Sequence, residues 1–169
     1  FEVVLEAGAV AHLTLNADAE PLPAPEPRPS HPAAGFEDTL RRACEAFLAR
    51  RGSGRTVIAG YPWFLDWGRD TLIACRGLLA AGWTQEVRTI LRTFARFEDR
   101  GTLPNMLSGE STANRETSDA PLWFALAVAE AAATAPEWLE EPLDDERTLR
   151  DVLVSIAEHG LVPSVQAAR

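Results

Sequence analysis

A proline-rich segment at positions 21–34 constrains this chain most, because it separates two patterns that cannot belong to one continuous element. Six of its fourteen residues are proline, and such a composition gives a stiff, extended connection. Before it, apolar residues alternate with others from Phe1 to Leu15, which predicts strands of a larger sheet. After it, apolar residues recur at helical spacing. We therefore expect three parts: strands over 1–20, a linker over 21–35 and a helical domain over 36–169.

The helical part is predicted to contain five helices. They are expected from Phe36 to Gly52, from 70 to 81, from Thr84 (as N-cap) to Asp99, from near Asp119, and from near Asp144. Three of them carry an apolar stripe: the first has Phe36, Leu40, Ala43, Phe47 and Leu48, the third has Val87, Ile90, Leu91, Phe94 and Phe97, and the fifth has Leu149, Val152, Leu153, Ile156 and Ala157. A β-type run at 56–59 separates the first two helices. Long loops on one side of such an array are common places for sites.

Composition excludes several classes of function. The net charge of −9 gives no basic field for nucleic acid or an anionic membrane. No apolar run is long enough to span a bilayer, and no signal peptide is visible, so a cytoplasmic protein is expected. Cys44 and Cys75 are predicted to be buried free thiols. His12, His31 and His159 are dispersed without ligand spacing, so neither a metal nor a cofactor is expected.

The run YPWFLDWGRDT at positions 61–71 carries the strongest chemical signal. Indole rings such as those of Trp63 and Trp67 offer flat faces for the C–H surface of a sugar. Arg69 and Asp70 offer charged donors and acceptors for neighbouring hydroxyls. The glycine beside them lets a backbone approach closely. This combination indicates a carbohydrate-binding wall.

The same residue types also have a purely structural interpretation. Asp66 or Asp70 could cap the second helix, with Arg69 as a surface partner of either. The aromatic side chains of Trp63, Phe64 and Trp67 could pack in the core. Spacing alone leaves this alternative open.

A wider stretch resembles the C-terminal glucosidase domain of glycogen debranching enzymes. The matching pieces, in that family's order, are TVIAGYPWFLDWGRDTLIA from Thr56, GLLAAG from Gly77, ILRTFA from Ile90, LPN from Leu103 and TSDAPLWF from Thr117. The resemblance implies an (α/α)6 toroidal barrel preceded by a β-sandwich. Residues 1–20 would then be the last strands of that sandwich and 36–169 the first helices of the barrel.

The resemblance also implies a reaction and a site. The family hydrolyses the α-1,6-linked glucose at branch points of glycogen or limit dextrin, and two carboxylates perform an inverting hydrolysis. The implied substrate-binding residues, around the glucose of the −1 subsite, are Trp63, Trp67, Arg69 and Asp70, with contributions from Asn105, Asp119 and Trp123. The last three keep structural alternatives: a turn residue, a helix cap and a core side chain, respectively.

The implied acid and base motifs do not occur before Arg169, and five helices cannot close a barrel of twelve. For these two reasons we expect this chain, whose start at Phe1 also suggests a fragment, to be the N-terminal part of the catalytic domain. It would be inactive alone, with the C-terminal half of the barrel as its partner and a branched α-glucan as its substrate.

Three other functions compete with this one. The first is a different (α/α)-barrel α-glucosidase. The second is a non-catalytic helical carbohydrate-binding or interaction domain, against which stands the absence of a fixed repeat of 30–45 residues. The third is a terpene cyclase-like enzyme with Asp144-Asp145-Glu146 as a magnesium–diphosphate motif, although this run is typical of a solvated connector.

Overall fold

The structure is a computed structural model that describes residues 4, 7, 35–61, 64–107, 114–115, 119–143 and 146–160. The chain divides into two units, Phe1–Thr39 and Leu40–Arg169. The strands predicted for 1–20 and most of the linker predicted for 21–35 lie outside the described residues. The elements are helices α1 Phe36–Phe47, α2 Gly68–Ala80, α3 Thr84–Ala95, α4 Ala120–Ala132 and α5 Leu149–Ser155, strands β1 Leu48–Arg51, β2 Gly54–Val57, β3 Asp66–Trp67 and β4 Met106–Leu107, and short helices η1 Pro136–Glu140 and η2 Ile156–Gly160.

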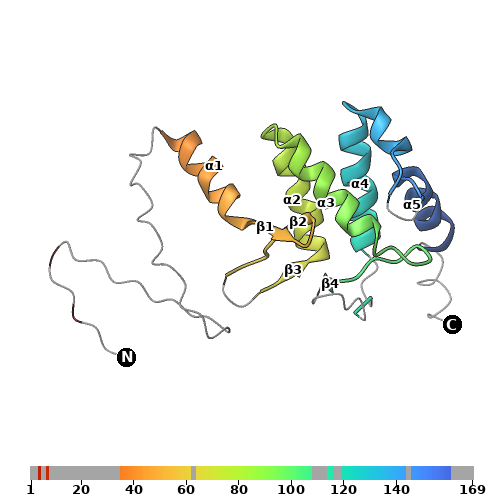
Figure 1. Cartoon of the computed structure of the whole chain (residues 1–169), viewed down its shortest axis with the longest axis horizontal. Coiled ribbons are helices and arrows are strands. Elements are labelled where there is room, and N and C mark those ends of the chain that lie inside the picture. Colours follow the sequence, from red (N-terminus) through yellow and green to blue (C-terminus); the bar gives the residue numbers. More distant parts are fainter. Residues whose placement is uncertain are drawn as a thin grey trace. The chain divides into compact units, whose positions relative to one another are not determined.

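Three helices of the second unit, α2, α3 and α4, lie side by side (Figure 1). The turn between α2 and α3 is short because Gly82 takes the left-handed conformation (φ +80°), which glycine adopts without steric cost. Its amide N–H donates to the carbonyl of Leu79 (2.9 Å), and that of Trp83 donates to Leu78 (2.9 Å). These bonds end α2 in the way predicted for Gly82 and turn the chain back into α3.

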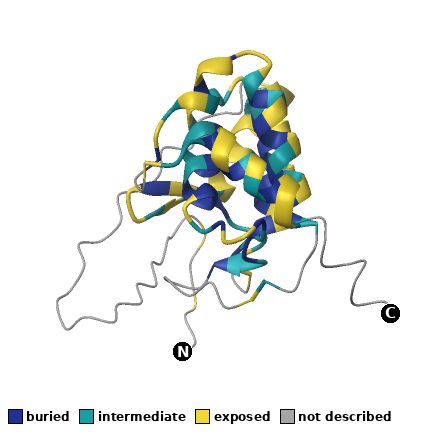
Figure 2. Ribbon diagram, turned by 90° about the vertical axis from the view of Figure 1, so that its right-hand side faces the viewer, coloured by how far each residue is buried: buried dark blue, intermediate teal, exposed yellow. Residues whose placement is uncertain are grey.

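The core lies between these helices, where their buried faces meet (Figure 2). Phe94 of α3 and Phe124 of α4 are fully buried there, with Leu72 of α2. The predicted stripe of α3 is confirmed: four of its five residues are buried and Phe97 is half-buried. A mainly helical fold is therefore confirmed, whereas the (α/α)6 barrel and the β-sandwich stay predictions.

The first predicted helix is wrong in its last five residues. It ends at Phe47 instead of Gly52, and the next four residues form β1, which pairs antiparallel with β2 (Leu48 opposite Val57). Gly52 (φ +53°) lies in the tight turn between these strands. In the hairpin, the backbone of these four residues is paired with β2 in place of the bonds that a longer helix would have made. The apolar residues Phe36, Leu40, Ala43 and Phe47 do share one face of α1, but none of this helix is buried.

The cysteine prediction holds for one residue. Cys75 of α2 is buried, and burial raises the pKa of its thiol to about 12. Cys44 is exposed on α1, which follows from the exposure of that whole helix.

Three other helix boundaries differ from the predictions. The third helix, expected to run to Asp99, ends at Ala95. Thr84 is the first helical residue of α3 and not its N-cap, which is Trp83 without a side-chain bond. The fifth helix begins at Leu149, because Thr148 and Asp151 form a reciprocal capping box there. The Thr148 amide donates to Oδ2 of Asp151 (2.8 Å), and the Asp151 amide donates to Oγ1 of Thr148 (3.2 Å).

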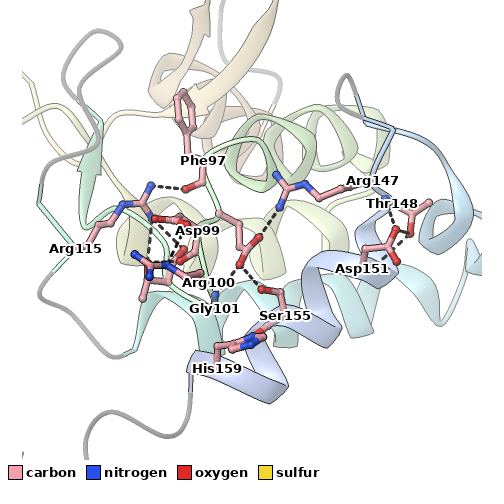
Figure 3. A network of polar contacts seen from close by, with 12 residues as sticks. Phe97, Asp99, Arg100, Gly101, Arg115, Arg147, Thr148, Asp151, Ser155 and His159 are labelled. Atoms are coloured by element: carbon pink, nitrogen blue, oxygen red, sulfur yellow. Dashed lines mark hydrogen bonds and ion pairs between the residues drawn. The ribbon is translucent and has the colours of Figure 1, made fainter.

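A polar network joins the loop after α3 to α5 (Figure 3). Its centre is the buried carboxylate of Glu98, which accepts bonds from the Gly101 amide, from Nη1 of Arg147 and from Oγ of Ser155, each at 2.6 Å. Arg115, which follows β4 in the sequence, donates to the carbonyl of Phe97 on the same loop (2.6 Å). The loop that leads to Asn105 and β4 is thus fixed from both sides.

Candidate functional site

An open pocket of about 260 Å³ lies beside the start of α2 and is lined by Ala59, Phe64, Trp67 and Asp70. Trp67 is half-buried, whereas Asp70 in the first turn of α2 is exposed. Small-molecule pockets usually measure about 300–1,000 Å³, so this one is suited to a single small ring. Its wall combines an indole and a carboxylate, the two groups expected for a sugar.

The local sequence builds this wall by strand alternation. In β3, consecutive side chains point to opposite sides: Asp66 is buried, and Trp67 lines the pocket. β3 pairs with β4, with Asp66 opposite Leu107 and Trp67 opposite Met106. The pairing brings the segment that contains Asn105 to the start of α2.

Gly68 makes the close approach of these segments possible. Its amide donates to the Asn105 carbonyl (2.8 Å). A Cβ atom at this position would lie 2.6 Å from the carbonyl oxygen of Pro104, a contact that real Cβ atoms do not make. Gly68 thus lets another backbone segment come close, as expected, and this segment is the neighbouring loop with Pro104 and Asn105.

Arg69 and Asp119, fifty residues apart, are brought together. Nη1 of Arg69 donates to Oδ2 of Asp119 at 3.2 Å, and the two side chains are 51% and 36% exposed. Such an exposed pair stabilises the fold little, so both groups remain available to a ligand. Asp119 occupies the N-cap position of α4, yet its side chain makes no capping bond.

The remaining predicted residues are placed less closely. Trp123 lies one turn after Asp119, since its amide donates to the Asp119 carbonyl (3.0 Å), and its half-buried ring packs against the core. Asn105 is half-buried, and its backbone groups bond Gly68 and Asn114. Trp63 lies outside the described residues.

The capping alternative fails for the two acidic residues of the motif. The N-cap of α2 is Trp67, without a side-chain bond, so neither Asp66 nor Asp70 caps this helix. Asp66 instead faces β1: its Oδ2 lies 3.1 Å from Nη1 of Arg51. The sequence interpretation missed Arg51 and two lining residues, Ala59 and Phe64. The turn sequence Gly52-Ser53-Gly54 was the signal that could have revealed the hairpin that carries Arg51.

Burial raises the pKa of Asp66 above its ordinary value, and the positive charge of Arg51 and the hydroxyl of Thr56 offset this only in part. A carboxyl whose pKa is higher in the folded chain than in the unfolded chain binds protons more tightly when folded. Its contribution to stability therefore grows as the pH falls through the folded pKa.

We accordingly expect Asp66→Asn to remove one component of the pH dependence of stability. The free energy of unfolding of the wild type, minus that of Asp66→Asn, should increase as the pH is lowered from 7 toward 4. Urea unfolding of both proteins across this range measures the difference. A difference that is flat or falls with acidification would contradict the buried environment of Asp66.

Three observations on the described residues concern metal binding, membrane insertion and the acidic run at positions 144–146. Among them no group of three or more His, Cys, Asp or Glu residues is placed to hold a metal ion. No helix within the described ranges is long and apolar enough to cross a membrane. Asp144 and Asp145 lie outside the described residues, and Glu146 is exposed.

Comparison with protein families gives one match. The model of the family described as Amylo-alpha-1,6-glucosidase matches residues 42–160, which is most of the chain and includes the pocket wall, both ends of the Arg69–Asp119 pair and the Glu98 network. The chain therefore belongs to the amylo-alpha-1,6-glucosidase family, the family of the C-terminal domain of glycogen debranching enzymes.

Proposed function

We propose that the pocket at Trp67 and Asp70 binds one terminal glucose unit of a branched α-glucan, as the −1 subsite of an amylo-α-1,6-glucosidase. The observation that carries this proposal is the wall itself, where an indole and a carboxylate line one open pocket of about 260 Å³. Indole faces stack on the C–H surface of a pyranose, and carboxylates accept bonds from neighbouring hydroxyls. Membership of the family supplies the class of reaction.

Each residue has a role in this proposal. Trp67 stacks on the sugar and Asp70 accepts from its hydroxyls. Arg69 donates to a hydroxyl while Asp119 holds its guanidinium through the 3.2 Å bond. Asn105 and Trp123 are proposed as further contributors to the subsite, as is Trp63, which lies outside the described residues.

The catalytic carboxylates are proposed to lie beyond residue 169. An inverting glycosidase uses two carboxyl groups, about 6.5–9.5 Å apart, as acid and base. Among the described acidic residues nearby, Asp66 is buried against Arg51 and Asp119 is paired with Arg69, whereas Asp70 lines the pocket. Asp70 is thus the one carboxylate that lines the pocket among the described residues, and one carboxylate is suited to binding and not to the two-carboxylate reaction. The chain alone is therefore expected to bind glucose without hydrolysing limit dextrin.

Substitutions in a protein that contains the complete catalytic domain test the proposal. Arg69→Ala and Asp70→Asn should each lower kcat/KM for glucose release from limit dextrin by about 100-fold or more, because a charge-assisted bond in the transition state contributes about 3 kcal/mol. Glucose release and thermal unfolding would be measured for each variant.

Arg76→Ala is the matched control, since Arg76 is another exposed arginine of α2 and pairs with Glu130 (2.7 Å). It should keep nearly normal kinetics. If Arg69→Ala and Asp70→Asn behave like this control, the two residues do not bind the substrate. Comparison of limit dextrin with unbranched maltooligosaccharides would identify a different α-glucosidase specificity.

A further inference from the structure

Behind the pocket wall, a buried ion pair joins two segments that are not adjacent in sequence. Arg51 is the last residue of β1, and Asp66 is the first residue of β3. Nη1 of Arg51 lies 3.1 Å from Oδ2 of Asp66, and the side chains are 20% and 4% exposed. The carboxylate is thus almost completely withdrawn from water, and the guanidinium approaches it from the β1–β2 hairpin as an ion pair, without a hydrogen bond to Oδ2.

Because β3 consists of two residues, Asp66 of this pair is followed directly by Trp67. Asp66 is held from behind by Arg51, and the next residue, Trp67, faces the pocket. On the other side of Trp67, the Gly68 amide is bonded to the Asn105 carbonyl (2.8 Å). Trp67 therefore lies between Asp66 and Gly68, which other segments hold in place, so the direction of its ring depends on both contacts.

The start of α2 is attached to the same hairpin by a second contact. Oγ1 of Thr71, which is fully buried, donates to the carbonyl of Val57 in β2 (3.1 Å). Asp70, which lines the pocket, is the residue before Thr71. The β1–β2 hairpin thus contacts the residue before Trp67 and the residue after Asp70, and in this way it supports both side chains of the pocket wall.

Stability alone does not account for a buried charge at this place. Arg51 is the charged group that acts on Asp66 among the described residues, and with Thr56 it offsets only part of the effect of burial on the pKa of that carboxyl. Ionised Asp66 therefore costs the folded chain free energy. Buried ion pairs whose attraction does not offset the cost of desolvation can often be replaced by neutral groups without loss of stability. The role best attested for such pairs is to fix one specific arrangement of the chain.

We propose that Arg51 and Asp66 form a positioning pair that holds β3 so that the Trp67 indole faces the pocket, and that they thereby set its affinity for a hexose. Neither residue touches the ligand. The identity of the ligand rests on the proposed function, whereas the orientation of Trp67 does not.

The first measurement is independent of any sugar. The chain is labelled with 5-fluorotryptophan, and the ¹⁹F resonance of Trp67 is assigned with Trp67→Phe. Asp66→Asn, which removes the charge but keeps the size of the side chain, should shift or broaden this resonance while the chain remains folded. Arg51→Ala should do the same, and in the wild type the resonance should titrate as Asp66 becomes protonated. Arg55→Ala, at an exposed position of β2, is the control and should leave the resonance unchanged.

The second measurement is the affinity for D-glucose, obtained from the same resonance. Arg51→Ala and Asp66→Asn should weaken binding by about tenfold, and Arg51→Lys, which keeps the charge but not the fork geometry, should recover most of the loss. Arg55→Ala should bind like the wild type.

The outcomes separate the two claims. An unchanged Trp67 resonance in both Arg51→Ala and Asp66→Asn would overturn the positioning role, whatever the sugar does. A shifted resonance in a chain whose wild type does not bind glucose would support the positioning role and refute the proposed ligand. A loss of glucose affinity that Arg55→Ala shares would also count against the pair.

Discussion

Replacing Gly101 with alanine should lower the free energy of unfolding by about 3–5 kcal/mol, the sum of backbone strain and forced overpacking. Gly101 has φ +78°, a conformation that side chains disfavour. In addition, a Cβ atom there would lie 2.2 Å from the backbone nitrogen of Gly160. Backbone cannot rotate away as a side chain can, so η2 or the loop after α3 must move. Because the Gly101 amide also donates to Glu98 (2.6 Å), the network of Figure 3 would be disturbed. Urea unfolding with a two-state fit measures the change.

Two other glycines separate the causes of this effect. Gly82 has a similar φ of +80°, but a Cβ atom there would meet nothing within 4 Å, so Gly82→Ala should cost only the strain, about 1–2 kcal/mol. Gly77, inside α2, also has free space around it, and Gly77→Ala should stabilise the chain by about 0.5–1 kcal/mol. A Gly101→Ala effect no larger than that of Gly82→Ala would mean that Gly101 and Gly160 do not approach closely.

Replacing Gly68 with alanine should reduce glucose affinity by more than tenfold at a moderate cost in stability, about 1–3 kcal/mol for an overpacked contact. The added methyl group would lie 2.6 Å from the carbonyl oxygen of Pro104. To relieve this contact, the segment of Asn105 must move away from α2, and the bond from the Gly68 amide (2.8 Å) would be lost. Trp67, the neighbour of Gly68, would then lose one of its two supports. Calorimetric titration with D-glucose, together with hydrogen exchange of the β3 and β4 amides, measures both consequences.

Gly77→Ala serves again as the control, because it adds the same methyl group to the same helix away from the pocket. It should leave glucose affinity unchanged. Normal affinity in Gly68→Ala, with protected β3 and β4 amides, would show that the loop contact does not support the pocket.

The helices were predictable where one residue type dictates the local structure. Gly82 ends α2 because glycine adopts a φ of +80° without strain. The apolar residues from Val87 to Phe94 lie on one face of α3, and that face is buried. The β1–β2 hairpin was not predicted, since Leu48–Arg51 has helical spacing and becomes a strand only because β2 pairs with it. The start of α5 was misplaced because charged residues near 144 resemble a first turn, whereas the capping box at Thr148 fixes the start five residues later, at Leu149.

Sequence reasoning reached part of the candidate site for a similar reason. Trp67, Arg69 and Asp70 lie within one short run, so their chemistry could be interpreted together. Their neighbours could not be found this way, because the contacts of Asp66 with Arg51 and of Gly68 with Asn105 join residues that are distant in sequence. The Arg69–Asp119 bond, across fifty residues, joins two residues that were each proposed separately.

The most direct test of the proposed glucose site is a crystal structure of the chain soaked with D-glucose. We expect one glucose in the pocket lined by Ala59, Phe64, Trp67 and Asp70, with its ring on the Trp67 indole and its hydroxyls bonded to Asp70 and Arg69. An empty pocket at saturating glucose, or a sugar bound only elsewhere, would contradict it.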